Sequence, residues 1–275
     1  MRVFSYQPTG GFLHSLNPSI KVLVIILTAV AVTFVLDIAT PLAFLIASLM
    51  TTVVLGRVPV RYVVRSMAPF LYVALSFVVI NTLFPRYTGS ITPIARIGPL
   101  TVSIEGLQLG LSIGLRVLFL ISTSLMLVTT TRPGDLVLSL VQQARLPYKL
   151  AYAILAAYRF VPILAGEYAN IRAAGLVRGG RVRGGVLAEL RNLRREAIPL
   201  LAGAIRRSER MAVAMDSRAF GAYPTRTYHR HLTVTAADWL FLTGALAVSA
   251  GIFVLLVYTG LISGVGLQLD QPPTR

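Results

Sequence analysis

"GLQLGLSIGLRVLFLISTSLMLV" (residues 106–128) decides the fold, because these 23 residues carry a single charge, Arg116. A helix that crosses the hydrocarbon core of a bilayer needs about 20 consecutive, largely apolar residues. Further apolar stretches, two of them short, lie at about residues 20–36, 41–55, 69–84 and 236–263. The sequence therefore predicts an all-α, polytopic membrane protein with about five transmembrane helices.

The overall composition favours the same fold class. Of the 275 residues, 55% are hydrophobic and 13% are charged, and the mean hydropathy is +0.74. Soluble domains contain about 25% charged residues. The absence of cysteine excludes disulfides, thiolate metal sites and cysteine nucleophiles. The three histidines (His14, His229 and His231) do not favour a metal site, and we expect the last two to lie near lipid headgroups.

Positive charge is concentrated in one part of the chain. Residues 132–230 hold 17 of the 26 Lys and Arg residues and 6 of the 10 Asp and Glu residues. Lys and Arg close to membrane segments mark the cytoplasmic side, so this block and the stretch "GRVPVRYVVR" (56–65) are expected inside. The loop at 85–104, with only Arg86 and Arg96, is then outside. Five crossings give a cytoplasmic N-terminus and an external C-terminus.

This charge pattern divides the chain into three expected parts. They are four transmembrane helices (1–131), a cytoplasmic domain of about three amphipathic helices (132–230), and a last transmembrane helix with a tail (231–275). Within the middle part, the spacing of apolar residues predicts a helix over 135–145 at the inner membrane surface. Two long helices are predicted at 147–178 and about 187–220. Charges inside the first of them favour an interfacial or re-entrant helix over a sixth crossing.

Two arginines stand near the ends of these long helices. Pro162 precedes Arg178 by 16 residues and Pro199 precedes Arg218 by 19 residues, which gives an approximate internal repeat. One interpretation is helix capping, in which Arg complements the helix dipole and a following glycine, such as Gly221, ends the helix. The other is docking, because an arginine fork among small neighbours suits a groove of a partner protein.

Residues 106–128 contain a stripe of small residues. Gly106, Gly110 and Gly114 lie four residues apart, so they share one helix face and permit close approach of a second helix. Arg116 is charged within the same segment and is expected to face the bundle interior or a polar cavity. Its candidate partners are the acids Asp37 and Glu105. The threonines at 129–131 are expected to satisfy backbone groups where this helix reaches the inner surface.

No motif for nucleotide binding or catalysis is present. The chain lacks a phosphate-binding G-x-x-x-x-G-K-[ST] loop and a dinucleotide-binding G-x-G-x-x-G turn. It also lacks a set of Ser, His and Asp arranged for nucleophilic catalysis. The stretch "RGGRVRGG" (178–185) has no interleaved aromatic residues, which disfavours RNA binding. If this protein works by ATP, another chain must bind it.

Several motifs, taken in order, resemble the transmembrane T component of energy-coupling factor (ECF) importers. "LHSLNPSIKVL" (13–23) is similar to the opening motif of that family, with Asn17 in place of an Asp. "RVLFLISTSLMLVTTTRPGDLVLSL" (116–140) and "RLPYKLAYAILAAYRFVPIL" (145–164) resemble its central region. Arg226 and Thr227 match a trailing motif. The family's paired Ala-Arg-Gly or Ala-Arg-Ala motifs fall on Val177, Arg178 and Gly179, and on Ser217, Arg218 and Ala219, so both leading alanines are replaced.

The resemblance implies a non-enzymatic scaffold without a cofactor of its own. In that family, the membrane helices hold a substrate-binding S component, and two cytoplasmic coupling helices insert their arginine tips into grooves of two ABC-type ATPases. The expected location is the prokaryotic cell membrane, with lipid as a further partner and no nucleic acid. The transported substrate stays open among vitamins, vitamin precursors and metal ions.

Two other functions remain as alternatives. An intramembrane enzyme would need paired acids, or a His and acid set, at matching depth, and Asp37, Glu105 and Asp238 are scattered along the ends of the segments. A basic membrane anchor would bind anionic lipid or nucleic acid through residues 132–230. The anchor predicts that the number of charges matters, whereas the coupling scaffold predicts that the positions of Arg178 and Arg218 matter.

Overall fold

The computed structural model describes residues 7, 10–35, 37–84, 93–97, 100–179, 184–223, 228 and 231–259, with the backbone alone at 93–97 and 100–102. The predicted motif residues Arg226 and Thr227, together with His229, lie outside the described residues. The chain forms two compact units, which we describe separately. Unit 1 comprises Met1–Ser139 and Leu232–Arg275, and unit 2 comprises Leu140–His231.

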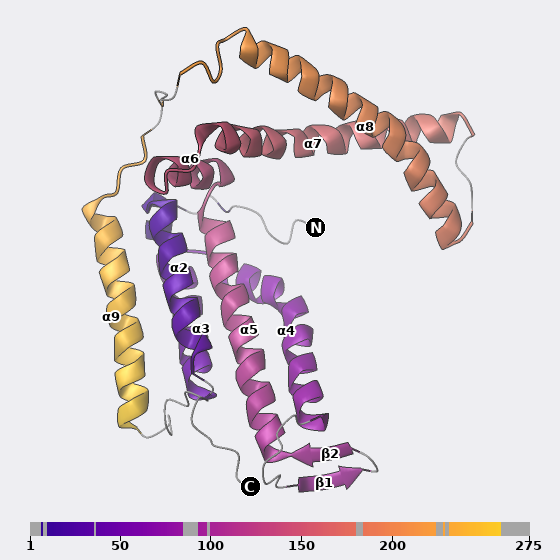
Figure 1. Cartoon of the computed structure of the whole chain (residues 1–275). Helices are drawn as coiled ribbons and strands as arrows, with labels where there is room; N and C mark the ends of the chain where they lie inside the picture. Colours follow the sequence, from indigo (N-terminus) through magenta and orange to yellow (C-terminus); the bar gives the residue numbers. More distant parts are fainter. Residues whose placement is uncertain are drawn as a thin grey trace, which may run out of the picture. The chain divides into compact units, whose positions relative to one another are not determined.

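Unit 1 is a bundle of apolar helices with a small hairpin at one end (Figure 1). In this bundle α5 lies between α3 and α4, and α9 lies against α2 and α3. Within the expected outer loop, β1 and β2 pair antiparallel. The elements are α1 (Phe12–Ser15), α2 (Pro18–Thr33), α3 (Ala39–Met50), the π-helical η1 (Thr51–Leu55), α4 (Val60–Leu83), β1 (Pro93–Ile97), β2 (Leu100–Ser103), α5 (Ile104–Thr130) and α9 (Ala236–Tyr258).

The sequence determines locally where these helices begin. The Asn17 side chain accepts a hydrogen bond from the backbone two residues on, and Pro18 occupies the first helical position of α2. Ser103 caps α5 in the same way, with its Oγ 3.0 Å from the Gly106 amide. Thr235 and Asp238 form a reciprocal capping box at the start of α9. Each cap satisfies amides that would otherwise lack a partner at membrane depth.

The core of unit 1 forms around α5. Phe119 packs edge-on against Phe44 of α3, with ring centroids 5.8 Å apart. Ser48 and Ser122 bring their hydroxyl oxygens to 2.9 Å in the same layer. Interhelical hydrogen bonds of this kind add to the packing of membrane helices, because no water competes for the hydroxyls.

The predicted glycine stripe is the point where α4 comes closest to α5. A Cβ added at Gly110 would lie 2.9 Å from the Cα of Val78, and one added at Gly114 would lie 3.0 Å from the Ala74 carbonyl oxygen. The first distance is shorter than real Cβ contacts, and the second is tighter than nine in ten of them. The backbones of the two helices are therefore in direct contact, as small-residue stripes in membrane helices permit.

Unit 2 contains the end of α6 (Pro133–Gln143) and two long helices that cross each other, α7 (Tyr148–Val177) and α8 (Val186–Asp216) (Figure 1). Both helices continue through their prolines, Pro162 and Pro199. α8 ends at Asp216, four residues before the predicted end at Phe220. Few side chains of α7 and α8 are buried, so most of their surface is exposed.

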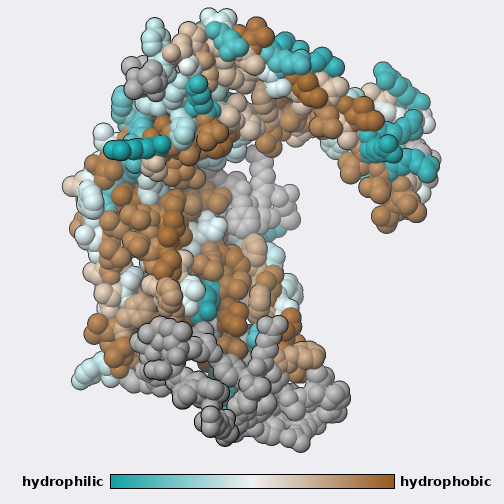
Figure 2. Space-filling model, viewed as in Figure 1, coloured by the Kyte–Doolittle hydropathy of each residue, from teal (hydrophilic) through white to brown (hydrophobic). Residues whose placement is uncertain are grey.

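Four described helices are long and apolar enough to cross a membrane, namely α4, α5, α7 and α9. α2 and the α3–η1 pair are apolar but shorter. On the face drawn in Figure 2, hydrophobic side chains dominate the surface of the unit 1 helices. By length and composition α7 could itself cross a membrane. The expected topology, with five crossings and α7 at the interface, therefore stays a prediction.

Candidate functional site

The first arginine tip ends α7. The Arg178 amide donates to the Ala174 carbonyl at 3.1 Å, and the Gly179 amide donates to the Leu176 carbonyl at 3.1 Å. Gly179 has a φ of +61°, the left-handed conformation that glycine adopts without strain. Arg178 is thus the last residue before the chain reverses. The neighbouring Val177 is 90% exposed, so an apolar side chain and a guanidinium are presented together.

The second tip, at the end of α8, repeats this geometry with different residues. The Phe220 amide donates to the Met215 carbonyl and the Ala219 amide donates to the Asp216 carbonyl, both at 3.0 Å. These two bonds define a Schellman motif whose left-handed residue is Ala219, with a φ of +53°. The expectation that Gly221 closes the helix was therefore wrong. The backbone already reverses two residues earlier, and α8 ends at Asp216 for that reason.

Arg178 and Arg218 consequently occupy equivalent positions. Each directly precedes a residue with positive φ, and each of those residues donates its amide to the carbonyl three positions back. Both arginine side chains are exposed. The C-terminal end of a helix carries partial negative charge, which stabilises a cation placed there. Helix capping and docking are thus compatible, because the cap fixes the direction in which each guanidinium leaves its helix.

A cavity of about 460 Å³ lies beside the second tip. Phe220 packs on two tyrosines from the start of α7, with ring centroids 5.7 Å from Tyr148 and 4.9 Å from Tyr152. Arg218 lines the same cavity, and the Tyr148 hydroxyl donates to the Tyr223 carbonyl at 2.8 Å. The aromatic contacts tie the tip of α8 to the start of α7. This role of Phe220 was not predicted; its only signal in the sequence is an aromatic residue directly after Ala219.

α7 and α8 are in contact at Glu167 of α7 and Gly203 of α8. A Cβ at Gly203 would lie 2.6 Å from Glu167 Oε1, and Arg207 forms an ion pair with Glu167 at 3.3 Å. Gly203 and Arg207 are four residues apart and so share one face of α8. Glu167 was interpreted from sequence only as a charge that disfavours a membrane crossing. The structure gives it a partner on the second long helix.

Within unit 1, Arg116 contacts backbone near the predicted partner Asp37. Its guanidinium donates to the Val35 carbonyl at 2.5 Å, two residues before Asp37 in the sequence. The Ser112 hydroxyl donates to the Asp37 carbonyl at 2.7 Å. Arg116 and Ser112 together hold the loop between α2 and α3 against α5. These contacts satisfy polar groups that would be costly in hydrocarbon.

A buried polar centre joins α2, α5 and α9, and the sequence analysis did not identify it. Lys21 and Asp238 are each 1% exposed. The Lys21 ammonium donates to the Thr130 carbonyl at 3.3 Å and to the Thr131 hydroxyl at 3.2 Å. The Asp238 carboxylate accepts a hydrogen bond from the backbone amide of Asn17 at 2.6 Å. The sequence did contain a signal for this centre, because Lys21 lies in the apolar stretch at 20–36 and a lysine within a membrane segment requires a partner.

The acids considered for an intramembrane enzyme are separated along α5. Asp37 lies next to Ser112 and Arg116, in the first half of α5, whereas Asp238 belongs to the polar centre at its other end, near Thr130. Glu105 lies in the first turn of α5. Across the described part of the chain, no group of three or more His, Asp or Glu side chains is placed to hold a metal ion.

The chain has clear relatives among known proteins. Residues 10–229 match the CbiQ family, which is described as "Cobalt transport protein". An "Energy-coupling factor transporter transmembrane protein EcfT" from Thermosediminibacter oceani is 31% identical over 255 residues, covering 89% of this chain and 94% of that protein. The protein of the same name from Bacillus subtilis is 28% identical over 263 residues, covering 93% and 98%.

A longer relative carries a different kind of name. A Bifidobacterium longum protein named as an ABC transporter ATP-binding protein is 28% identical over 261 residues, which cover 92% of this chain but 33% of that protein. The family match, the EcfT relatives and the apolar helices agree with one another. This chain therefore belongs to the CbiQ family and is a multi-pass membrane component of the ECF transporter type.

Proposed function

We propose that this chain is the coupling subunit of an ECF-type importer, which transmits movements of two separate ABC ATPases to a substrate-binding membrane S component. The observation that carries the proposal is the equivalence of Arg178 and Arg218. Each arginine directly precedes a residue with positive φ whose amide bonds the carbonyl three positions back, so the two form a matched pair of candidate contacts. A matched pair suits two copies of one kind of partner, or two closely similar partners.

The tips have the chemistry that such docking requires. A guanidinium offers a planar fork of donors for carboxylates and carbonyl oxygens of a partner groove. Exposed apolar side chains next to the tips, such as Val177 and Val213, would be buried by the same contact. The longer Bifidobacterium longum relative supports an ATPase as partner, because its name assigns ATP binding to a chain that includes a region similar to this protein.

The two long helices are suited to transmit movement. α7 has 30 residues and α8 has 31 residues, so each is about 45 Å long. They meet near Glu167 and Gly203, away from both tips. When one tip is displaced by its ATPase, the crossing point passes the displacement to the other helix as a change of crossing angle.

The topology of this proposal follows from charge. Residues 132–230, with 17 of the 26 Lys and Arg residues, face the cytoplasm and the ATPases. The N-terminus is cytoplasmic and the C-terminus external. Substrate specificity resides in the S component, so vitamins, vitamin precursors and metal ions stay open for this chain. ATP hydrolysis takes place in the ATPase subunits.

The test is assembly with the ATPases after charge reversal at the tips. Arg178→Glu and Arg218→Glu are made separately and together, and the complex with its ATPases is purified through a tag on this chain. Loss of a docked charged group costs about 2 kcal/mol or more, so we expect roughly 30-fold weaker association for each single variant. The double variant should lose both the complex and uptake.

Matched controls reverse arginines on the same helices away from the tips. Arg172 in α7 and Arg210 in α8 are exposed, and Arg172→Glu with Arg210→Glu changes the net charge equally. The coupling proposal expects normal assembly of this control. Equal losses in both double variants would instead favour a basic membrane anchor, for which only the number of charges matters. Normal assembly of the tip variant would show that these arginines do not dock.

A further inference from the structure

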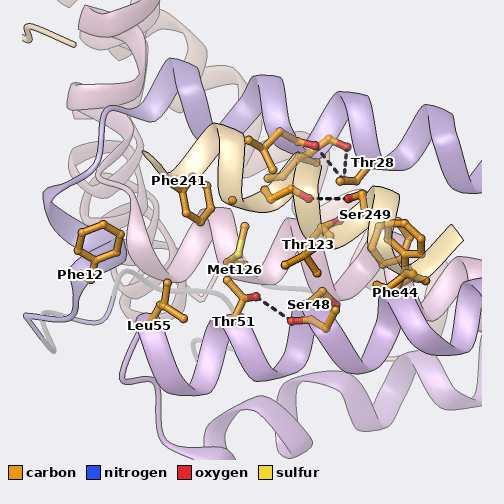
Figure 3. Close-up of a pocket in the computed structure, with 18 of the residues that line it drawn as sticks. Phe12, Thr28, Phe44, Ser48, Thr51, Leu55, Thr123, Met126, Phe241 and Ser249 are labelled. Atoms are coloured by element: carbon orange, nitrogen blue, oxygen red, sulfur yellow. Dashed lines mark hydrogen bonds between the residues drawn. The ribbon is translucent and has the colours of Figure 1, made fainter. Parts of the chain in front are cut away.

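Unit 1 contains a cavity of about 380 Å³ that neither tip nor the polar centre uses. It lies among α2, α3, α5 and α9, with α1 at one end (Figure 3). Leu240 and Val248 of α9 line it and are 70% and 56% exposed, so the cavity opens to the outside of the bundle along α9. In a membrane, this side of the bundle faces hydrocarbon.

The lining of this cavity selects an apolar occupant. No charged side chain lines it among the described residues. Its hydroxyl groups already hydrogen-bond within the protein; Thr28 bonds the Val24 carbonyl at 2.8 Å and Ser249 bonds the Ala245 carbonyl at 2.7 Å (Figure 3). Similar bonds engage Ser48, Thr51 and Thr123. A ligand in this space finds no free donor, and apolar cavities of this kind take up apolar molecules.

The shape of the cavity distinguishes a single hydrocarbon chain from a partner helix. Along α9 the lining runs from Leu240 to Ile252, which is about 18 Å at 1.5 Å per residue. The centre of a water-sized sphere can occupy about 380 Å³ over this length, a mean cross-section of about 20 Å², and adding the sphere's radius of about 1.4 Å gives a space about 8 Å wide. That width admits one chain of methylene groups, whose carbons contact their neighbours at about 4 Å. An α-helix, with a diameter of about 10 Å, does not fit.

Small residues on α9 create this space. Gly244, Ala245 and Ser249 line the cavity, and a Cβ added at Gly244 would meet nothing within 4 Å. Gly244 is therefore not required for close packing of helices, in contrast to the glycines of α5. We propose that the cavity is a binding site for one acyl chain of a membrane lipid, which fills the space between α9 and the rest of unit 1.

The first experiment uses the full-length chain in lipid nanodiscs, without ATPases or S component, released into a mass spectrometer under native conditions. We expect one phospholipid retained per chain. Gly244→Leu extends a side chain into the cavity and displaces at least about two methylene groups of the lipid, which predicts roughly tenfold lower retention. Gly251→Leu is the matched control, because Gly251 is on the same helix, does not line the cavity, and also has nothing within 4 Å of an added Cβ.

The second experiment needs no variant. A phosphatidylcholine with a photoreactive diazirine in the middle of one acyl chain is incorporated into the nanodiscs, and the labelled residues are mapped after illumination. Phe119 and Met126 line the cavity but are only 2% and 4% exposed, so lipid around the bundle does not reach them. Val254, 69% exposed on α9, reports the surrounding lipid.

Label on Phe119 or Met126 as well as Val254 is the expected result. Label on Val254 alone, or equal lipid retention by the Gly244 and Gly251 variants, would overturn the acyl-chain site. Both measurements use this chain by itself. Their outcome is therefore independent of whether Arg178 and Arg218 dock on ATPases.

Discussion

Unit 1 buries polar side chains among apolar helices, whereas unit 2 exposes apolar side chains among charged ones. In unit 1, Lys21 and Asp238 are each 1% exposed and are held by hydrogen bonds from three helices. In unit 2, Val177 and Val186 are 90% and 87% exposed. The bundle thus gives its buried ammonium and carboxylate hydrogen-bond partners, while the long helices expose apolar side chains beside charged ones. The same substitution should therefore have different effects in the two units.

The largest expected difference concerns acidic residues. Asp238→Ala removes the acceptor of the Asn17 backbone amide and one of the two negative charges that act on the buried Lys21, the other being Asp135, so we expect unit 1 to lose roughly 3–5 kcal/mol of stability. Asp216→Ala, at the exposed end of α8, should change stability by less than about 0.5 kcal/mol. Thermal unfolding in detergent, followed by the fluorescence of the single tryptophan, Trp239 of α9, measures the first, and amide hydrogen exchange along α8 measures the second. Equal effects would show that the polar centre is not a stabilising contact.

Glycines should respond with opposite signs in the two units. Gly110→Ala drives a Cβ into the backbone of α4, and overpacking of this kind costs about 1–3 kcal/mol. Gly166→Ala in α7 meets nothing within 4 Å, and replacing a helical glycine by alanine gains about 1 kcal/mol. The midpoint of thermal unfolding reports the first change, and amide hydrogen exchange along α7 reports the second. Destabilisation at Gly166 would mean that a contact covers this face of α7.

The two arginine tips should differ in strain. Gly179→Ala places a Cβ at a positive φ and should cost about 1 kcal/mol locally, and Ala219→Gly should relieve a similar amount. Faster exchange of the backbone amide at position 179 in the first variant and slower exchange of the Phe220 amide in the second are the expected results. No change at either tip would contradict the equivalence of the two helix ends.

The smallest expected effect is at the crossing of α7 and α8. Glu167 and Arg207 are about one-third exposed, so their ion pair should contribute about 0.5 kcal/mol. A double-mutant cycle with Glu167→Gln and Arg207→Gln, read by hydrogen exchange of both helices, measures it. A coupling free energy above about 2 kcal/mol would show that the crossing is a rigid joint and that the long helices move as one body.

Much of the architecture could be predicted from local patterns. Apolar stretches located the helices of unit 1, and the spacing of Gly106, Gly110 and Gly114 identified the face on which α4 packs. The two long helices of unit 2 were predicted within a few residues of their observed bounds. The end of α8 was misplaced, because an alanine in the left-handed conformation leaves no signal comparable to glycine.

The sequence by itself determined the class of protein, the helical segments and the two arginines, because hydrophobicity, helix period and charge act over a few neighbouring residues. Only the tertiary structure decided which distant residues meet. Asn17 and Asp238 are separated by 221 positions, and Lys21 and Thr131 by 110. The cavity likewise draws its lining from six helical elements, α1, α2, α3, η1, α5 and α9. Such contacts depend on how whole helices pack, and no local pattern encodes that packing.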